Sequence, residues 1–301
     1  MNEQLGRAQA WLQRSVQNEC LLVSGITKKH SPLSVLLMGL LILNTIGVVA
    51  PMLLALMSSF KSTAEIMNAP FGLPQSLNLT NFAQVLGEGN FGIYFRNSVL
   101  VTVGAEVIIL SLSSMAGYAL ARYRFRLNGA LYMLILMGLM IPAKLLLVPL
   151  FLQLKQMGLL DSLWGLILVY AAGGIPAGVF ILTGFFRALP HALEAAARID
   201  GAGEWTIFHR IMLPLVRPQL AIVAIYTAIP IWNDFLLPIV FISSANLKTM
   251  PQGLSVFFGE YAVNMGALFA GLTISALPLI VLYLVLSEQF IKGLTAGAVK
   301  G

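Results

Sequence analysis

Charged residues are scarce in this chain of 301 residues. Lys, Arg, Asp and Glu make up 10% of the sequence, against about 25% in an ordinary soluble domain. Apolar residues reach 58%, so the remaining polar residues are too few to cover a surface that faces water. The composition excludes an ordinary soluble protein and predicts an integral membrane protein. Because one membrane helix needs about 20 residues, the chain has room for several spans.

Cysteine and catalytic motifs are almost absent as well. The single Cys20 excludes an internal disulfide. Three histidines, His30, His191 and His209, lie in separate segments without a Cys or His at ligand spacing, which argues against a metal site. The sequence has no Gly-x-x-x-x-Gly-Lys-Ser/Thr, the usual loop that binds ATP phosphates. We therefore expect neither catalysis nor a cofactor in this chain.

Long apolar runs are what the chain does contain. The polar segment 1–31 precedes a first run that is too long for the apolar core of a signal peptide, so this run predicts a retained membrane anchor. The sequence predicts an all-α integral membrane protein with a transmembrane domain at 32–292 and a short tail at 293–301. The six predicted spans are 32–60, 98–121, 130–154, 163–186, 220–241 and 269–291.

The distribution of basic residues predicts the orientation of these spans. If the amino terminus is inside, the inner segments carry thirteen Lys and Arg and the outer segments and helix ends carry five. This bias places both termini and the loop 187–218 in the cytoplasm. The net charge of +6 is scattered among apolar spans, so it fits membrane orientation better than nucleic-acid binding.

The most informative stretch is the polar segment 193–218. Glu194 falls near the start of a predicted helix, where the helix dipole favours an acid, and the three alanines 195–197 leave a flat face that another backbone can approach. Gly201 and Gly203 supply the backbone freedom to end this helix and turn the chain, and Gly201 is expected at positive φ. A second short helix is predicted from Glu204 until proline interrupts it. The predicted product is a helix-turn-helix elbow.

This elbow resembles the EAA loop of ABC importer membrane subunits, whose pattern is Glu-Ala-Ala, three variable residues, Gly, nine variable residues and Ile-x-Leu-Pro. Gly201, Ile211, Leu213 and Pro214 fit the pattern at the right spacing. The family's acid position, however, holds Ala195, and Glu194 lies one residue early, which turns the acid by about 100° around a helix. The resemblance implies a coupling helix that docks into an ATPase subunit. The implied coupling residues are Glu194, Ala195, Ala196, Ala197, Asp200, Gly201, Ile211, Leu213 and Pro214.

Further motifs are similar to carbohydrate-type permease subunits of the kind that pair in maltose importers. These motifs are Ser58-Ser59-Phe60-Lys61, Arg96-Asn97-Ser98, Ala116 to Arg122, Met140-Ile141-Pro142, Trp232 to Leu236 and the tail from Gly293. The resemblance implies a subunit in the bacterial cytoplasmic membrane that takes a carbohydrate from an extracytoplasmic solute-binding protein. It also implies a second, homologous permease and two ATPase subunits as partners.

An ion-coupled secondary transporter or channel is the alternative from a different class. Such proteins usually carry ion-coupling carboxylates and often inverted repeats with broken helices. The sequence shows no convincing repeat, and an elbow would have no role in such a protein.

Two carboxylates, Glu106 and Asp234, fall inside predicted spans. Counted from span ends near Ser98 and Phe241, both lie about 10–12 Å deep. An ionisable group that faces lipid costs several kcal/mol, so each should face the helix bundle or a watery cavity, with Asn97, Trp232 and Asn233 as candidate neighbours. They predict either a polar vestibule, in which Trp232 stacks on the solute and Asn233 supplies an amide, or a structural hydrogen bond between two helices.

The outer loops are unequal. The segment 61–96 is rich in turn residues with apolar anchors and is expected to fold against the membrane surface. The loop at about 242–268 carries polar residues that include Thr249 and Gln252, with Phe257, Phe258 and Tyr261 behind them. Exposed amides and aromatics suit a docked partner or a sugar, and aromatics at the membrane interface are the alternative.

Overall fold

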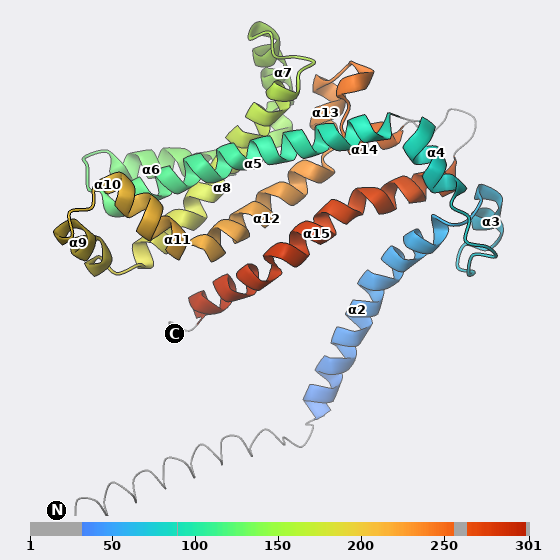
Figure 1. The fold of residues 1–301 in the computed structure, drawn as a ribbon, viewed down its shortest axis with the longest axis horizontal. Helices are drawn as coiled ribbons and strands as arrows, with labels where there is room; N and C mark the ends of the chain where they lie inside the picture. The colour runs from blue at the N-terminus through green and yellow to red at the C-terminus, as the bar shows by residue number, and fades with distance from the viewer. Residues whose placement is uncertain (1–31, 89, 256–263, 299–301) are drawn as a thin grey trace, which may run out of the picture. The chain divides into compact units, whose positions relative to one another are not determined.

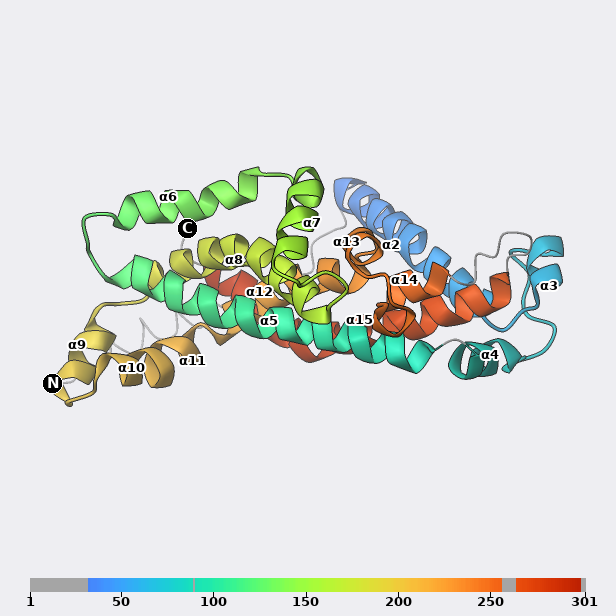
Figure 2. The same ribbon diagram turned by 90° about the horizontal axis from the view of Figure 1, so that it is seen from above.

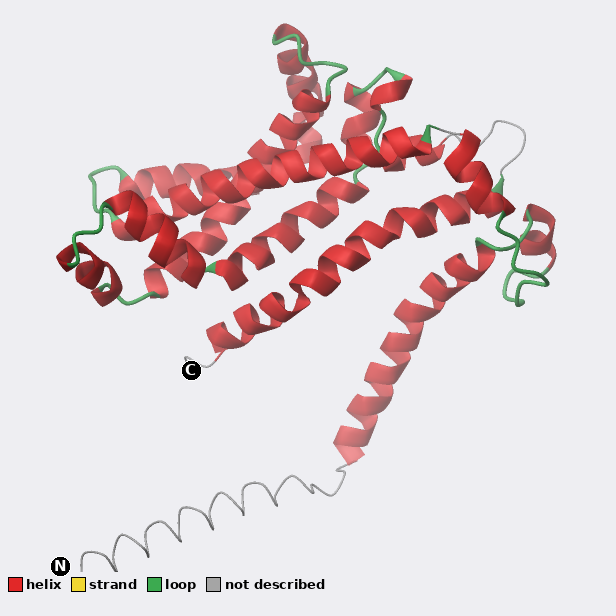
Figure 3. Ribbon diagram, in the orientation of Figure 1, coloured by secondary structure: helices red, strands yellow, loops and turns green. Residues whose placement is uncertain are grey.

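The computed structural model describes residues 32–88, 90–255 and 264–298, and the regular structure in this part of the chain consists of helices joined by loops, without a strand (Figure 3). Figure 1 labels the helices, with connecting loops between them. The longer helices are α2 (Pro32–Ser58), α5 (Phe91–Arg122), α6 (Asn128–Met137), α7 (Leu147–Gln156), α8 (Leu163–Ala188), α12 (Arg217–Asn233) and α15 (Met265–Ala298). The shorter ones are α3 (Thr63–Asn68), α4 (Thr80–Glu88), α9 (Ala192–Ile199), α10 (Glu204–Thr206), α11 (Leu213–Leu215), α13 (Leu236–Phe241) and α14 (Met250–Leu254).

Within the described residues, four helices are long and apolar enough to cross a membrane, and the number rises to six if each of two bent helix pairs is one span. The four are 34–58, 91–122, 163–188 and 265–287. The all-helical membrane fold expected from the sequence is therefore confirmed at this level. The length and composition of the helices leave the exact number of spans between four and six.

Helix α2, as far as Leu54, belongs to the first of two compact units. Its membrane candidate, Ser34–Ser58, has an apolar side chain at nearly every position and coincides with the predicted first span. Pro51 lies inside the helix, which a membrane helix tolerates because its neighbours can satisfy the freed backbone group. The segment 1–31, the predicted amino-terminal domain, lies outside the described residues.

The second unit, from Ala55 onward, is built on the long helices α5, α8, α12 and α15. Helices α5 and α8 lie side by side in both views (Figures 1 and 2). Small residues allow this approach, because a Cβ added to Gly117 would lie 3.2 Å from the backbone N of Thr183, and one added to Gly178 would lie 2.7 Å from the Cβ of Ser113. Close packing through small residues is typical of membrane helices.

Three predicted spans differ from the helices of the structure. Helix α5 begins at Phe91 and not near Ser98, because the polar pair Arg96-Asn97 belongs to the helix. The span predicted at 130–154 is broken near Ile141 and Pro142, where the chain bends by 87°. The span predicted at 220–241 ends as α12 at Asn233, and α13 follows after Asp234 and Phe235.

The loop after α13 packs against the first turns of α5. Asn97 is fully buried and donates hydrogen bonds from Nδ2 to the carbonyl oxygens of Asn246 (2.9 Å) and Lys248 (3.0 Å). Thr249 and Gln252, which the sequence analysis expected to be exposed, are 5% and 4% exposed. Backbone polar groups must be satisfied near a membrane, and here side chains of α5 and of the loop satisfy them. Phe257, Phe258 and Tyr261 lie outside the described residues.

The carboxyl-terminal helix α15 runs to Ala298. The tail predicted at 293–301 is therefore helical as far as the structure describes it. Trp232 of α12 donates its indole N–H to the carbonyl oxygen of Ser275 at 3.0 Å, which fastens α12 to α15.

Candidate functional site

The elbow turns at Gly201, as predicted. The N–H of Ala202 donates to the carbonyl oxygen of Ala197 (2.9 Å), and the N–H of Gly201 donates to that of Arg198 (3.1 Å). These two bonds form a Schellman motif, which ends a helix with a residue in the left-handed region. Gly201 occupies that position with φ of 80°. Gly203 has φ of −71°, so the second glycine does not need glycine's special freedom, and that part of the prediction is wrong.

The second arm of the elbow is a helix with a widened turn. It starts as α10 at Glu204, continues as a π-helix over Ile207–Met212 and ends as α11 at Leu215. The N–H of Leu213 bonds to the carbonyl oxygen of Phe208, five residues back. Pro214 follows and has no N–H to continue the ladder. The chain then bends by 73° into α12. Among described residues the buried side chains of this arm are Ile207, Phe208 and Met212.

Glu194 points into the protein and meets Arg122, the last residue of α5. The Nε atom of Arg122 lies 3.1 Å from Oε1 of Glu194, and the two side chains are 1% and 4% exposed. Arg122 also donates from Nη2 to the carbonyl oxygen of Leu189 at 2.8 Å, and its Nη1 lies 3.3 Å from the His191 ring. The acid that lies one residue early in the motif therefore has an internal partner. Sequence reasoning did not single out Arg122 as a site residue.

A second contact joins α5 to the other arm of the elbow. The hydroxyl of Tyr123 donates to Oε2 of Glu204 at 2.6 Å, and Arg198 donates from Nε to Oε1 of the same carboxylate at 2.8 Å. These hydrogen bonds, first from Arg198 and then from Tyr123, lower the pKa of Glu204. Burial, followed by the contact with Glu204, raises the pKa of Tyr123. The end of α5 thus holds α9 through Arg122 and α10 through Tyr123.

The elbow also carries exposed apolar side chains on both of its arms. Ala195 and Ala196 are exposed, and Ile199 is 86% exposed. Trp205, 64% exposed, stacks on His209 with ring centroids 6.1 Å apart. We call these five residues the elbow face. Of the other implied coupling residues, Asp200 is exposed, Ala197 is buried, and Ile211, Leu213 and Pro214 are half-buried.

The two carboxylates that fall inside predicted spans, Glu106 and Asp234, lie in different places in the structure. Oε1 of Glu106 accepts a hydrogen bond from the Thr227 hydroxyl at 2.6 Å, whereas Oε2 is buried without a hydrogen-bond partner among the described residues. Because α5 begins at Phe91, Glu106 lies about 22 Å from its start and not about 12 Å. Thr227, the partner of Glu106, precedes Asp234 by seven residues, which corresponds to about 10 Å along a helix. The two carboxylates therefore lie apart along the direction of α12, and their equal depth in the membrane stays a prediction.

Asp234 interrupts the helix that the sequence predicted to be continuous. Its Oδ1 accepts from the N–H of Leu236 at 3.0 Å, and its Oδ2 accepts from the Tyr170 hydroxyl at 2.8 Å. A side chain that accepts from backbone N–H groups two and three residues on starts a new helix, and Leu237 supplies the third-residue contact at 3.4 Å. Tyr170 was missed by the sequence analysis, since a tyrosine in an apolar run gives no signal by itself.

The predicted neighbours of these carboxylates have other partners. Trp232 is 4% exposed and packs edge-on against Phe95. Asn233 is exposed and donates its amide to the carbonyl oxygen of Ile229 at 3.1 Å. Asn97 binds the loop described above. Trp232 therefore offers no open face for stacking in this conformation.

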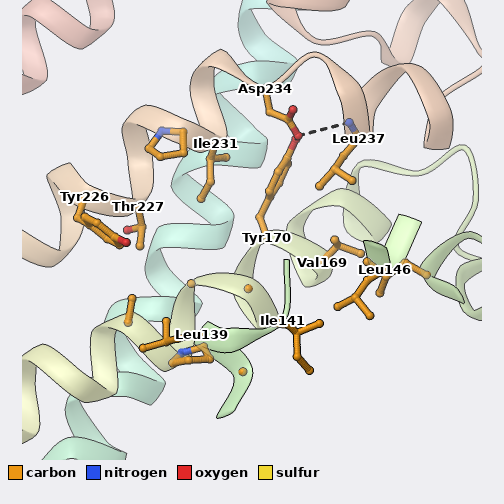
Figure 4. A pocket seen from close by; sticks show the side chains of 18 residues that line it. Leu139, Ile141, Leu146, Val169, Tyr170, Tyr226, Thr227, Ile231, Asp234 and Leu237 are labelled. Atoms are coloured by element: carbon orange, nitrogen blue, oxygen red, sulfur yellow. Dashed lines mark hydrogen bonds between the residues drawn. The ribbon is translucent and has the colours of Figure 1, made fainter. Parts of the chain in front are cut away.

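A cavity of about 640 Å³ lies beside Asp234, between α8, α12, α13 and the bent segment 138–150 (Figure 4). In Figure 4 the ring of Tyr170 points at the carboxylate of Asp234, and Tyr226 and Thr227 lie along the same wall. The cavity is lined by Gly138, Leu139, Ile141, Leu146, Leu150, Val169, Tyr170, Ala172, Gly173, Gly174, Pro176, Ala177, Tyr226, Thr227, Pro230, Ile231, Asp234 and Leu237.

These features define a class of protein. A helical membrane body with a glycine-closed elbow and a cavity of small-molecule size suits a membrane transport protein. The comparison with known proteins agrees. Residues 110–295 match the family described as binding-protein-dependent transport system inner membrane component. The chain belongs to this family, and it is a multi-pass permease subunit of an ABC importer whose ATPase is a separate subunit.

The relatives are similar over most of their length. The diacetylchitobiose uptake system permease protein NgcG of Streptomyces coelicolor is 41% identical over 261 residues, which cover 86% of each chain. The arabinooligosaccharides transport system permease protein AraQ of Halalkalibacterium halodurans is 37% identical, over 84% of this chain and 91% of the relative. A chain in the crystal structure of a bacterial ABC transporter involved in the import of the acidic polysaccharide alginate matches with a TM-score of 0.75 at 23% identity. That match covers 88% of this chain and 98% of the other chain, so the two proteins share the same fold.

Proposed function

We propose that this permease subunit carries a carbohydrate, in the form of an oligosaccharide or sugar derivative, from an extracytoplasmic solute-binding protein into the cytoplasm. The supporting relatives are named for the uptake of diacetylchitobiose and of arabinooligosaccharides. The partners would be a second, homologous permease and two ATPase subunits. The importer would lie in a bacterial cytoplasmic membrane with both termini inside, as the thirteen-to-five bias of basic residues favours.

The elbow would couple the permease to its ATPase. One observation carries this proposal: the elbow is held from inside by the buried Arg122–Glu194 pair, while the apolar side chains of the elbow face remain exposed. An exposed side chain such as Ile199, at 86%, gains by burial against a partner. Ala195 stands on this face where the related loops have an acid, so the ATPase cleft would meet a small apolar surface there.

Co-purification tests the coupling directly. The chain would be expressed with its partner permease, the ATPase and the binding protein, and the permease would be captured by a tag. We expect the ATPase to be retained and ATP-dependent uptake of a neutral oligosaccharide in proteoliposomes. Ile199→Glu should release the ATPase, because it places a charge on the elbow face without loss of an internal contact. Leu77→Glu, a matched change at a site 78% exposed outside the elbow, should retain it.

Two results would contradict the proposal. Uptake by the permease without an ATPase would point to an ion-coupled transporter. Equal ATPase retention by Ile199→Glu and Leu77→Glu would remove the elbow face as the docking surface.

A further inference from the structure

Two prolines inside helices line the cavity beside Asp234. Pro176 lies inside α8 and Pro230 inside α12, and both line the cavity. Proline has no N–H, so the carbonyl four residues earlier loses its helical partner. Those carbonyls belong to Ala172 and Tyr226, which line the same cavity. Two carbonyls that lack their regular helical donor thus belong to residues of the cavity wall, and a membrane protein has to satisfy such groups by other means.

Side chains add to this acceptor surface. Asp234 lines the cavity, and each of its two oxygens has more than one lone pair, so the three hydrogen bonds it accepts do not exhaust its capacity. Tyr226 is 60% exposed and carries a hydroxyl for which no hydrogen bond is formed within the described part of the chain. None of the cavity-lining residues among those described is Lys, Arg or His. The wall therefore combines acceptors and one anion without a cation.

The size and shape of the cavity suit a sugar. Its volume of about 640 Å³ falls within the range of about 300–1,000 Å³ that small-molecule sites occupy. Helix α8 contributes small residues to the wall, and a Cβ added at Gly173 would meet nothing within 4 Å. Tyr226 adds an exposed aromatic ring, an amphipathic surface that suits the apolar face of a sugar ring.

We propose that this cavity is a subsite for an uncharged carbohydrate, whose hydroxyl groups donate to Asp234 and to the carbonyls of Ala172 and Tyr226, and that it rejects acidic sugars. Neutral sugars bring many O–H donors, which match a wall of acceptors. A uronate brings carboxylates, which the Asp234 carboxylate repels because no lining residue among those described supplies a compensating cation. The inference rests on the proposed carbohydrate transport and narrows it to neutral or N-acetylated sugars.

Protection of an introduced cysteine tests the subsite. Replacing Cys20 by Ser gives a cysteine-free chain, into which Gly173→Cys places a thiol on the cavity wall. Gly184→Cys is the matched control, since it is also an exposed glycine of α8 with nothing within 4 Å of an added Cβ, and it does not line the cavity. The complete importer in proteoliposomes would be labelled with N-ethylmaleimide with and without millimolar diacetylchitobiose, arabinotriose or trigalacturonate.

We expect at least one neutral sugar to slow labelling of Gly173→Cys at least threefold, no effect of trigalacturonate, and no effect of any sugar on Gly184→Cys. Asp234→Asn in the Gly173→Cys chain should let trigalacturonate protect, because it removes the repelling charge. If this variant does not assemble, the comparison of neutral and acidic sugars in the Gly173→Cys chain still tests the selectivity. Equal protection by neutral and acidic sugars would overturn the selectivity. A Gly173→Cys thiol that no sugar protects, or that does not react, would overturn the subsite.

Uptake by the unsubstituted importer separates the two proposals. If radiolabelled neutral oligosaccharides are taken up and Gly173→Cys is not protected, the subsite is wrong and carbohydrate transport stands. If no carbohydrate in the panel is taken up with ATP, the proposed function itself fails.

Discussion

The buried pair between Arg122 and Glu194 allows a quantitative prediction. Arg122→Leu leaves the Glu194 carboxylate, 4% exposed, without its cation and the carbonyl oxygen of Leu189 without its donor. Removal of one partner from a buried ion pair costs about 3–5 kcal/mol. At about 1.4 kcal/mol per factor of ten, the fraction of molecules with a detached elbow should rise by roughly two to more than three orders of magnitude.

A buried cysteine in the elbow measures this fraction. Ala197 is 6% exposed, so Ala197→Cys in a Cys20→Ser chain should react with maleimide only when the elbow opens. In permease without its ATPase, Arg122→Leu should accelerate labelling by at least about 100-fold, the lower end of that range. Arg198→Gln is the control, because the Arg198–Glu204 pair lies at the surface, with side chains 45% and 51% exposed, and exposed pairs contribute little.

The double variant Arg122→Leu with Glu194→Leu distinguishes a missing contact from an orphaned charge. Apolar replacement of both members of a buried pair is often neutral, so the double variant should label more slowly than either single variant. The reasoning would be refuted if Arg122→Leu labelled at the rate of the parent, or if the double variant opened more than both single variants combined.

Three further predictions concern other parts of the chain. Gly201→Ala should destabilise the elbow turn by about 1 kcal/mol, because Gly201 has positive φ, and should weaken ATPase retention. Gly203→Ala should leave ATPase retention unchanged. Both sites have open space for a Cβ, so equal ATPase retention by the two variants would count against the role of φ. Hydrogen bonds from Ser244, first its hydroxyl and then its N–H, and from the N–H of Ser243 lower the pKa of Asp161. The stability from these bonds is therefore present above the carboxyl's unfolded pKa of about 3.9 and is lost as pH falls through the lower folded value. Melting curves should show Asp161→Asn less stable than the parent at neutral pH and the gap closing in acid; a constant gap would refute this. A cysteine at Lys248 should label from outside intact cells and one at Gly203 should not, and the reverse pattern would invert the topology.

The sequence predicted the elbow well because its determinants are local. Helix capping, a glycine at positive φ and prolines that end a helix all act within a few residues. The partner of Glu194 could not be found in this way, since Arg122 lies 72 residues earlier in the chain. The position of the acid along α9 becomes meaningful only after α5 and α9 are packed together.

The span boundaries failed for a related reason. Polarity was interpreted as a sign of loop, yet Arg96 and Asn97 lie inside α5 because the amide of Asn97 satisfies carbonyls of the loop 246–248. Asp234 had the opposite effect, because its carboxylate caps α13 and so breaks a run that hydropathy alone reads as continuous. In both cases one polar side chain decides how backbone groups are satisfied. A mean hydropathy taken over a window of residues does not detect the effect of that one side chain.

Helix α5 is the element that connects the two regions. At one end Asn97 holds the loop at Asn246 and Lys248, and at the other Arg122 and Tyr123 hold the two arms of the elbow. From Asn97 to Arg122 the helix spans about 38 Å. A shift of the elbow therefore either displaces α5 or breaks the buried pair, which costs about 3–5 kcal/mol. Because both sets of contacts sit on one helix, movement of the elbow that keeps the pair intact also moves the anchor of the loop.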